Sequence, residues 1–219
     1  MPKIILYGPL AVPYTEKCRR ALMLKRLEFE LREPSGPEDV RRWSPETGLL
    51  PVMTLDGELI SDSTRILRRL DEIQPEPPLL SSDPVVAEQQ RQLEDWADES
   101  FLLYYQQWLR IAREIAAEPV SAPRERRPQR FLRWIRPPAG RAPRELEVLR
   151  GVESRLDDLV NLLGTRPFFY ADRVSMADLT VYGMLSSLGR DTITGAAALI
   201  DKRPALLAFR QRVEEATAG

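Results

Sequence analysis

The sequence predicts an α/β domain with the order β-α-β-α-β-β-α, followed by an all-helical domain. Short strand-like apolar runs alternate with helical patterns only near the N-terminus, and after a proline-rich segment every periodic stretch is helical. The first β-α-β unit implies two parallel strands joined by a right-handed crossover. We therefore expect an α/β domain at residues 1–74, a linker at 75–84 and an all-helical domain at 85–219.

The first half of the α/β domain begins with the buried-type strand KIILY, which Gly8-Pro9 ends. Pro13 suits the first turn of a helix that opens at Tyr14 or Thr15. The expected elements are a strand at residues 3–7, a helix from about 14 to 25, a half-buried strand at 27–31 and a short helix at 37–43.

Residues 50–70 read as strand, turn, strand and helix. Asp56-Gly57 is a two-residue hairpin turn that accepts positive φ angles. The polar residues 61–64 suit the start of a helix, whose apolar stripe follows. This hairpin adds antiparallel strands to the sheet.

The same stretch offers a binding site. Pro51 is tolerated at the start of a strand, and a cis Leu50–Pro51 bond would leave the backbone of Leu50 to pair with an extended ligand. Ser63 begins a helix, whose free N–H groups and hydroxyl suit a carboxylate. We expect an edge for a peptide-like backbone beside an anion site.

The second domain contains long amphipathic helices. Ser175 and Asp178 form a capping box before a nearly all-apolar helix, which should be buried on all sides. Besides this helix, whose apolar residues run from Leu179 to Leu185, helices are expected at about residues 85–117, 144–163 and 203–216. A proline- and arginine-rich loop at 119–143 should hold one short helical segment at 129–135.

Composition excludes several classes of protein. The net charge of -1 does not suit a general nucleic-acid binder, and no apolar run is long enough to span a membrane. The single cysteine and the absence of a signal-peptide pattern indicate a cytoplasmic protein. Because the chain has no histidine, histidine-based nucleophile arrangements are excluded and a metal site is not expected.

Three segments together resemble the cytosolic glutathione transferase superfamily over almost the whole chain. Residues 44–52 (SPETGLLPV) are similar to the family's Asn-Pro-x-Gly-Lys-Val-Pro-Val segment, with one extra residue. Asp62-Ser63 resembles its Glu/Gln-Ser pair, and residues 175–178 resemble the capping motif of its helical domain. The resemblance implies a thioredoxin-like N-terminal domain, glutathione as co-substrate and a homodimer.

The resemblance also implies roles for individual residues. Glutathione would lie extended, with its cysteinyl backbone on Leu50 before cis-Pro51 and its γ-glutamyl end on Asp62 and Ser63. The pocket for a hydrophobic electrophile would be lined by Val12, Tyr14, Tyr104 and Trp108.

The chain departs from the family where the glutathione thiol is activated. Val12 occupies the position of the catalytic Ser or Cys and can donate nothing. Tyr7 at the end of the first strand could replace it, as could Tyr14 or Thr15, although Thr15 suits a helix cap. The dipole of the first helix could also stabilise a thiolate.

A second departure is Leu49, where the family often has a Lys or Gln that meets the glycyl carboxylate of glutathione. Lys17 and Arg42 are the candidates to replace that cation. Asp95 and Asp98 are expected on a solvated helix face. Cys18 reads as a buried hydrophobe rather than a reactive thiol.

Several alternatives stay open. Tyr104, Tyr105 and Trp108 suit core or dimer contacts as well as ligand contacts. The arginines of 124–141 suit a solvated lid, an anionic substrate or a nucleic acid. The leading hypothesis is a detoxifying glutathione transferase. A non-catalytic ligand- or protein-binding protein of the same fold is the alternative, and an isomerase or reductive dehalogenase is a third.

Overall fold

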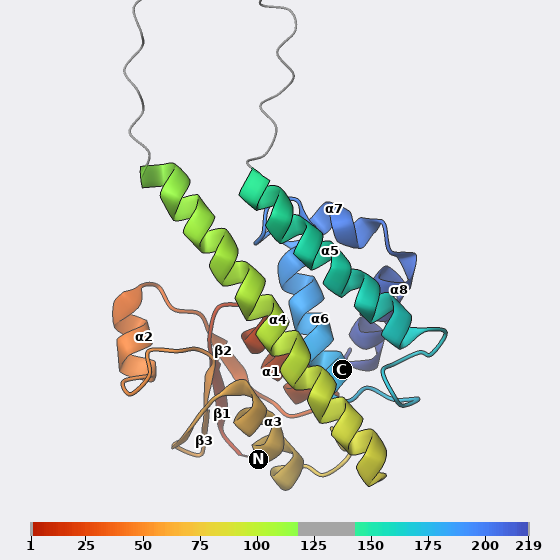
Figure 1. The fold of residues 1–219 in the computed structure, drawn as a ribbon. Helices are drawn as coiled ribbons and strands as arrows, with labels where there is room; N and C mark the ends of the chain where they lie inside the picture. The colour runs from red at the N-terminus through yellow and green to blue at the C-terminus, as the bar shows by residue number, and fades with distance from the viewer. Residues whose placement is uncertain (1, 118–142, 219) are drawn as a thin grey trace, which may run out of the picture.

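The computed structural model describes residues 2–117 and 143–218. The chain forms an α/β unit and a helical unit that pack side by side, with α4 (Pro84–Ala117) crossing the front of the molecule (Figure 1). The predicted fold class and the predicted element order of the α/β unit are confirmed. The expected helical segment at 129–135 and the arginines of 124–141 lie outside the described residues.

The sheet has four strands in the order β2-β1-β3-β4. β1 (Ile4–Tyr7) pairs in parallel with β2 (Glu30–Arg32) and antiparallel with β3 (Val52–Leu55), which continues into β4 (Glu58–Ser61). The hairpin turn has positive φ at both Asp56 and Gly57, as predicted.

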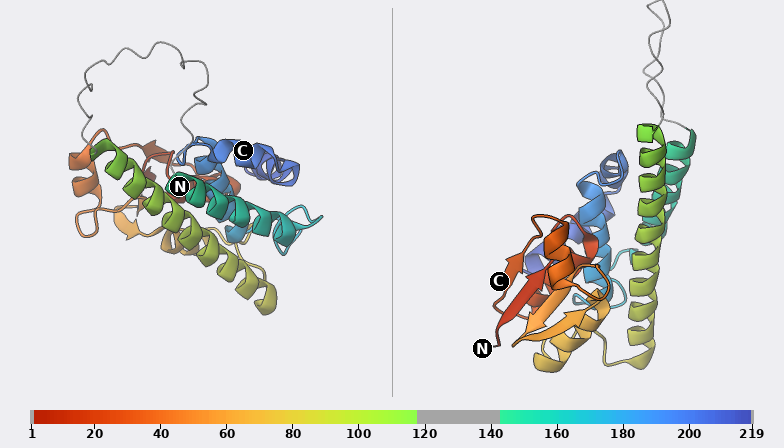
Figure 2. Two further views of the ribbon diagram at one scale, coloured as in Figure 1. Left: turned by 45° about the horizontal axis from the view of Figure 1, so that its top comes forward. Right: turned by 90° about the vertical axis from the view of Figure 1, so that its left-hand side faces the viewer.

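Helices α1 (Pro13–Leu24) and α3 (Ser63–Ile73) cover one face of the sheet, and α2 (Pro37–Trp43) lies near the other (Figure 2). The apolar face of α3 is fully buried through Ile66, Leu67 and Leu70. On the second face, Trp43 packs against Tyr7 with ring centroids 4.8 Å apart. The sheet is thus buried on both sides near its centre.

The helical unit is built around α6 (Met176–Gly189), which is buried along nearly its whole length, as its apolar sequence predicted. The capping box is confirmed, because the Asp178 carboxylate accepts from the backbone N–H of Ser175 at 2.8 Å. The other helices are α4, α5 (Pro143–Leu163), α7 (Ala196–Asp201) and α8 (Pro204–Ala216).

Three local expectations need correction. The first helix begins at Pro13 rather than at Tyr14 or Thr15, because Val12 takes the N-cap position. The second strand pairs over Glu30–Arg32 and not over 27–31, since Leu27 and Phe29 pack against the core ahead of the ladder. The short helix α7 was not expected at all. Within 2–117 and 143–218, no helix is long and apolar enough to cross a membrane.

The two units meet most closely where α6 passes the start of α1. A Cβ atom added to Gly183 would lie 2.5 Å from the backbone oxygen of Pro13 and 3.5 Å from the backbone nitrogen of Lys17. Real Cβ atoms do not approach backbone that closely, so only glycine fits here. This contact fixes the distance between the units.

Replacing Gly183 with Ala should lower the free energy of unfolding by about 2–3 kcal/mol, because the methyl group would push α6 away from α1. The loss should occur although alanine favours a helix over glycine. Urea denaturation of the purified variant measures it.

Gly189→Ala is the matched control on the same helix. There the added methyl would meet only the flexible guanidinium of Arg210, at 3.1 Å. Its effect should stay within about 0.5 kcal/mol. Equal losses in the two variants would contradict the close-contact explanation.

Candidate functional site

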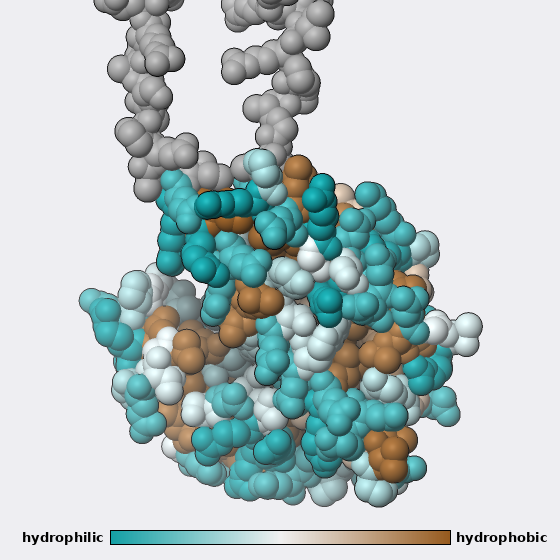
Figure 3. Space-filling model, in the orientation of Figure 1, coloured by the Kyte–Doolittle hydropathy of each residue, from teal (hydrophilic) through white to brown (hydrophobic). Residues whose placement is uncertain are grey.

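One cavity of about 630 Å³ lies between α4 and the α/β unit. It brings together four of the predicted glutathione-binding residues, from segments that are separate in the sequence. Hydrophobic side chains gather along the hollow beside α4 (Figure 3). The lining residues are Tyr14, Thr47, Leu49, Leu50, Pro51, Ser61, Asp62, Ser63, Asp98, Glu99, Leu102 and Gln106.

The first wall of the cavity is the segment that leads into β3. The Leu50–Pro51 peptide bond is cis. Val52, the next residue, already pairs with Tyr7 on one side and Ser61 on the other. Leu50 therefore stands just before the paired part of a central strand and lines the cavity.

The second wall is the start of α3. Asp62 is the N-cap residue, and its carboxylate accepts from the backbone N–H of Arg65 at 3.0 Å. Its φ of +78° is unusual for a residue other than glycine, and such strain often occurs at binding sites. Ser63, which is 6% exposed, begins the helix beside the cavity. A serine and a helix N-terminus thus border the same space.

The third wall comes from one face of α4. Asp98, Leu102 and Gln106 follow one another at intervals of four residues, so their side chains lie along one stripe of the helix. This stripe was not among the features expected from the sequence, although the spacing of four residues is visible there. Asp98 was expected, together with Asp95, on a solvated helix face.

That placement is wrong for Asp98. Its carboxylate lies 3.0 Å from the Nζ of Lys17, and the Asp98 side chain is only 25% exposed. Lys17 is completely buried and also contacts Glu94 at 2.5 Å. Glu94 in turn accepts a hydrogen bond from the hydroxyl of Thr64 on α3, so this buried network joins α1, α3 and α4.

The pKa values of Lys17 and Asp98 in this network are both raised above their ordinary values. Burial alone would lower the pKa of Lys17, but Asp98 and Glu94 raise it above its ordinary value, so the ammonium stays charged. Burial raises the pKa of Asp98 to about 6, against the attraction of Lys17 and with help from Glu94 and Asp62. A carboxyl that titrates near neutral pH therefore lies in the cavity wall.

Lys17 and Arg42 were the candidates to replace the missing cation at position 49. Lys17 is committed to its two carboxylates and has no exposed surface. Arg42 is held on α2 by Asp39, at 2.5 Å, and does not line the cavity. Leu49 itself is 72% exposed. Neither Lys17 nor Arg42 therefore supplies the cation that is missing at position 49.

Neither Tyr7, at the end of β1, nor Thr15, in the first turn of α1, is among the residues that line the cavity. Tyr7 is 9% exposed and packs on Trp43 and Leu50, with the guanidinium of Arg32 5.8 Å from its ring. The hydroxyl of Thr15 is buried, has no hydrogen-bond partner and lies against Gly8. The sequence suggested that Thr15 caps the helix, but the N-cap residue is Val12 and the Thr15 hydroxyl makes no capping hydrogen bond.

Tyr14 does line the cavity, but its hydroxyl donates to the backbone oxygen of Asp98 at 3.2 Å. Burial raises its pKa far above the ordinary value, with Asp98 adding to the effect, so it resists ionisation. Val12 is the N-cap residue of α1 and contributes no side-chain hydrogen bond. It is not among the residues that line the cavity.

The helical unit holds this loop from outside. Ser187 on α6 donates its hydroxyl to the backbone oxygen of Ala11 at 2.9 Å. The guanidinium of Arg190, just beyond α6, donates to the backbone oxygen of Leu10. The loop is therefore anchored by residues more than 170 positions away in the chain, as the separations of 176 and 180 show.

The structure does not bring the predicted electrophile-pocket residues of α4, Tyr104 and Trp108, to the cavity. Tyr104 packs against Gly151 of α5 so closely that no side chain would fit there. Trp108 packs against the main core. Neither lines the cavity, whose α4 wall is instead formed by Asp98, Glu99, Leu102 and Gln106.

Two further expectations concern side chains beside the cavity. Cys18 is completely buried, its thiol lies 3.9 Å from the backbone oxygen of Ser63, and burial raises its pKa. Its interpretation as a buried small hydrophobe is confirmed. Within 2–117 and 143–218, no three acidic or cysteine side chains gather in a way that would hold a metal ion.

Comparison with known proteins identifies the family. The model of the glutathione S-transferase N-terminal domain matches residues 6–78, and that of the glutathione S-transferase C-terminal domain matches residues 144–218. The chain therefore belongs to the glutathione transferase superfamily, as its sequence motifs indicated. Members of this family use glutathione as substrate.

Individual relatives are distant. Glutathione S-transferase U9 of Arabidopsis thaliana is 30% identical over 86 residues, which are 37% of this chain and only 36% of that protein. Among solved structures, a Tau class glutathione S-transferase from mango is 20% identical with a TM-score of 0.68, over 97% of this chain and 88% of its own. The beta-etherase LigF from Sphingobium is 21% identical with a TM-score of 0.69, over 97% and 95%. Rice GST1, solved in complex with glutathione, is 20% identical with a TM-score of 0.70, over 99% and 89%.

The unusual pKa of Asp98 predicts a pH effect on stability. The carboxyl titrates at about 6 in the folded protein against an ordinary 3.8, so the folded state holds the proton more tightly than the unfolded chain. Its contribution to the free energy of unfolding is therefore full below about pH 4 and is lost as the pH rises through 6. The free energy of unfolding of Asp98→Asn, taken relative to that of the wild type, should rise between about pH 4 and 6 and then level off. Denaturation at closely spaced pH values measures this difference.

Asp95→Asn is the control, because Asp95 lies on the same helix but is exposed. The rise expected for Asp98→Asn should be absent in this variant, because Asp95 is not part of the Lys17 network. A flat difference for Asp98→Asn as well would show that Asp98 titrates as an ordinary carboxyl.

Proposed function

We propose that this protein is a glutathione transferase-like enzyme that adds the thiolate of glutathione to a hydrophobic electrophile. The observation that carries the proposal is the meeting of Leu50, Pro51, Asp62 and Ser63 in one cavity. An extended peptide could pair with the backbone of Leu50 while its end carboxylate lies at the start of α3. The γ-glutamyl ammonium would then lie near the Asp62 carboxylate.

The reaction needs a thiolate, because the thiolate is the nucleophile. Sulfur attacks an electrophilic carbon, a C–S bond forms, and the leaving group departs with its bonding electrons while the thiol proton passes to solvent. Tyr7 remains the first candidate to stabilise the thiolate, since its strand position pairs with Val52 next to Pro51. Thr15 and the dipole of α1 are the others.

The rival proposal is a non-catalytic protein of the same fold that binds a ligand or partner. Several observations favour it. Val12 has no hydroxyl, the Thr15 hydroxyl is buried, and the Tyr14 hydroxyl is already donated to a backbone oxygen. The site could therefore bind the tripeptide and leave its sulfur unactivated.

Oligomeric state and compartment follow the family in this proposal. We expect a cytoplasmic homodimer that acts in detoxification, with the domain boundaries at 74 and 85. In the structure, the last helix of the α/β unit ends at Ile73 and the first helix of the next unit begins at Pro84, which supports those boundaries.

Ser63→Ala should weaken glutathione binding about tenfold, because a hydrogen bond to a charged group contributes about 1.5 kcal/mol. Isothermal titration measures the dissociation constant. Ser35→Ala is the control, since Ser35 is exposed and lies ahead of α2, outside the cavity. The absence of any binding heat in the wild type would contradict both the proposed enzyme activity and glutathione binding.

Tyr7→Phe should lower the rate of conjugation with a chloronitrobenzene acceptor about tenfold, which corresponds to about 1.4 kcal/mol of thiolate stabilisation. Tyr170→Phe is the control, because Tyr170 packs beside Arg166 and does not line the cavity. If the conjugation rate is unchanged in Tyr7→Phe but falls in Thr15→Val, Thr15 and not Tyr7 stabilises the thiolate. A wild type that binds glutathione but conjugates no acceptor would favour the rival proposal.

A further inference from the structure

The proposed function gives no role to Asp98, although Asp98 lines the cavity. Its place on α4 lies close to the start of α3. Glu94 accepts a hydrogen bond from the hydroxyl of Thr64, the second residue of α3, so α4 passes that helix start here. Asp98 lies one turn further along α4 and contacts the same Lys17 as Glu94 does. The ligand end that lies at the start of α3 would therefore meet Asp98.

One oxygen of the Asp98 carboxylate is available to a ligand. Oδ2 lies 3.0 Å from the Nζ of Lys17, whereas Oδ1 accepts no hydrogen bond from residues 2–117 and 143–218. The residue is also fixed in position, because the hydroxyl of Tyr14 donates to its backbone oxygen at 3.2 Å. Helix α1 thus holds Asp98 at two points, and a donor in the cavity would find Oδ1 already in place.

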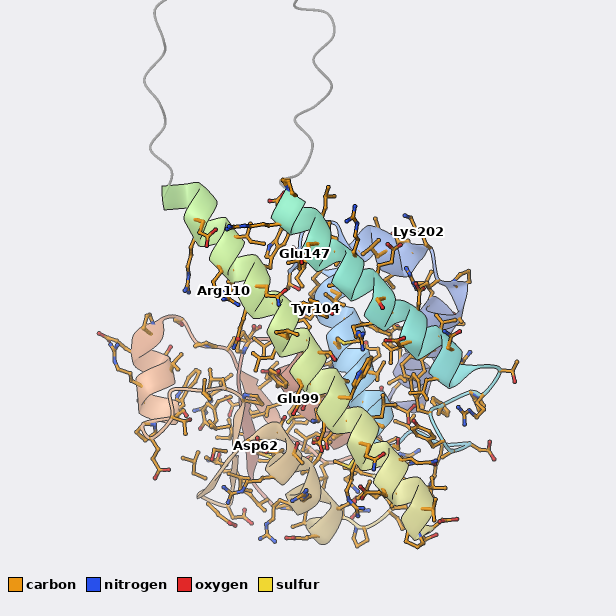
Figure 4. All side chains as sticks on the ribbon, viewed as in Figure 1. Asp62, Glu99, Tyr104, Arg110, Glu147 and Lys202 are labelled. Atoms are coloured by element: carbon orange, nitrogen blue, oxygen red, sulfur yellow. The ribbon has the colours of Figure 1, made fainter. Side chains whose placement is uncertain are left out.

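The Lys17 network lacks one positive charge when its acids are ionised. Its single ammonium contacts two carboxylates, those of Glu94 and Asp98. A carboxylate that is largely removed from water needs a cation or a proton. The lining adds two more acids, Asp62 at the start of α3 and Glu99 on α4 (Figure 4), and its described residues include no Lys or Arg. A second cation would therefore have to come from a ligand.

Without that cation, a proton takes its place. Asp98 faces Lys17 and Tyr14 on α1, Glu94 on α4 and Asp62 at the start of α3. Burial raises the pKa of Asp98 to about 6, and Glu94 and Asp62 add to the effect against the attraction of Lys17. Asp98 thus takes up a proton just below neutral pH.

We propose that the α-ammonium of the γ-glutamyl end supplies the missing charge by donating to Oδ1 of Asp98, where it replaces the proton. The inference rests on the proposed function, which places the γ-glutamyl end at Asp62 and Ser63. The γ-glutamyl carboxylate keeps the helix N-terminus as its partner, and the ammonium, which is charged at pH 7 and below, lies between Asp62 and Asp98. Ligand binding then releases a proton from Asp98 to the buffer.

Isothermal titration of the full chain at pH 7 tests whether the ammonium is recognised. The ligands are glutathione and glutaryl-cysteinylglycine, in which a hydrogen atom replaces the α-ammonium and no bulk is added. The analogue should bind about tenfold more weakly, because it loses a hydrogen bond between charged groups.

The same titration at lower pH tests the exchange of the proton. The affinity for glutathione should fall about tenfold from pH 7 to pH 5, because a carboxyl with a pKa of about 6 must lose its proton on binding. At pH 6 about half a proton should be released per glutathione bound. Binding heats in buffers that differ in their heat of ionisation count this proton, and the analogue should show neither effect.

Asp98→Asn should abolish both the preference for glutathione over the analogue and the release of the proton. Glu99→Gln is the matched control, because Glu99 is also an acid of the cavity lining but is exposed and makes no contact with Lys17. It should keep the proton release. If Asp98→Asn does not fold, the proton count of the wild type carries the test alone.

The outcomes separate the two proposals. If the analogue binds as tightly as glutathione, or if the wild type releases no proton, the role of Asp98 is overturned while the proposed function stands. An affinity for glutathione that rises between pH 7 and pH 5 would overturn it as well, because Asp98 would then keep its proton in the complex. If neither ligand binds at any pH, the proposed function fails and this inference fails with it.

Discussion

The structure depends on a buried ammonium. Lys17 has no exposed surface, and it contacts carboxylates of α4 from its place on α1. A buried charge is tolerated only when it is paired and hydrogen-bonded, so α1 and α4 must keep their relative positions. Thr64 extends the requirement to α3, because its hydroxyl donates to the same Glu94. The cavity is formed from these elements, and its geometry follows from this pairing together with the close approach of Gly183 to Pro13.

The same network determines the charge that a ligand meets. Lys17 attracts two carboxylates into a small volume, and Asp98 reaches the cavity surface from there. The protein thereby stabilises its domain contact with groups that also face the binding site. The packing of the units and the charge of the cavity wall are consequently coupled in one cluster of side chains, and a substitution that changes the charge of the wall also changes the contact between the units.

The sequence was sufficient for the fold and for one half of the site. Several features are local patterns, in which residues close in sequence determine the geometry. They are the Asp56-Gly57 turn, the Ser175–Asp178 capping box and the meeting of Leu50-Pro51 and Asp62-Ser63 in one cavity. The Lys17 network could not be predicted, because its partners lie 77 and 81 positions away and an isolated lysine on a helix normally faces water. Thr15 was misread for a related reason. Its position suits a cap, but the approach of Gly8 turns its hydroxyl inward.

The loop between β1 and α1 belongs to the first domain by sequence, yet its backbone oxygens are held by Ser187 and Arg190 of the second. The conformation of the segment that would face the thiol is therefore specified by both halves of the chain. During evolution, such a loop cannot be exchanged with its own domain alone. A recombined gene that joined this N-terminal half to the helical half of a distant relative would retain the cavity wall from Leu50 to Ser63 and lose the support of the loop, which favours joint inheritance of the two halves.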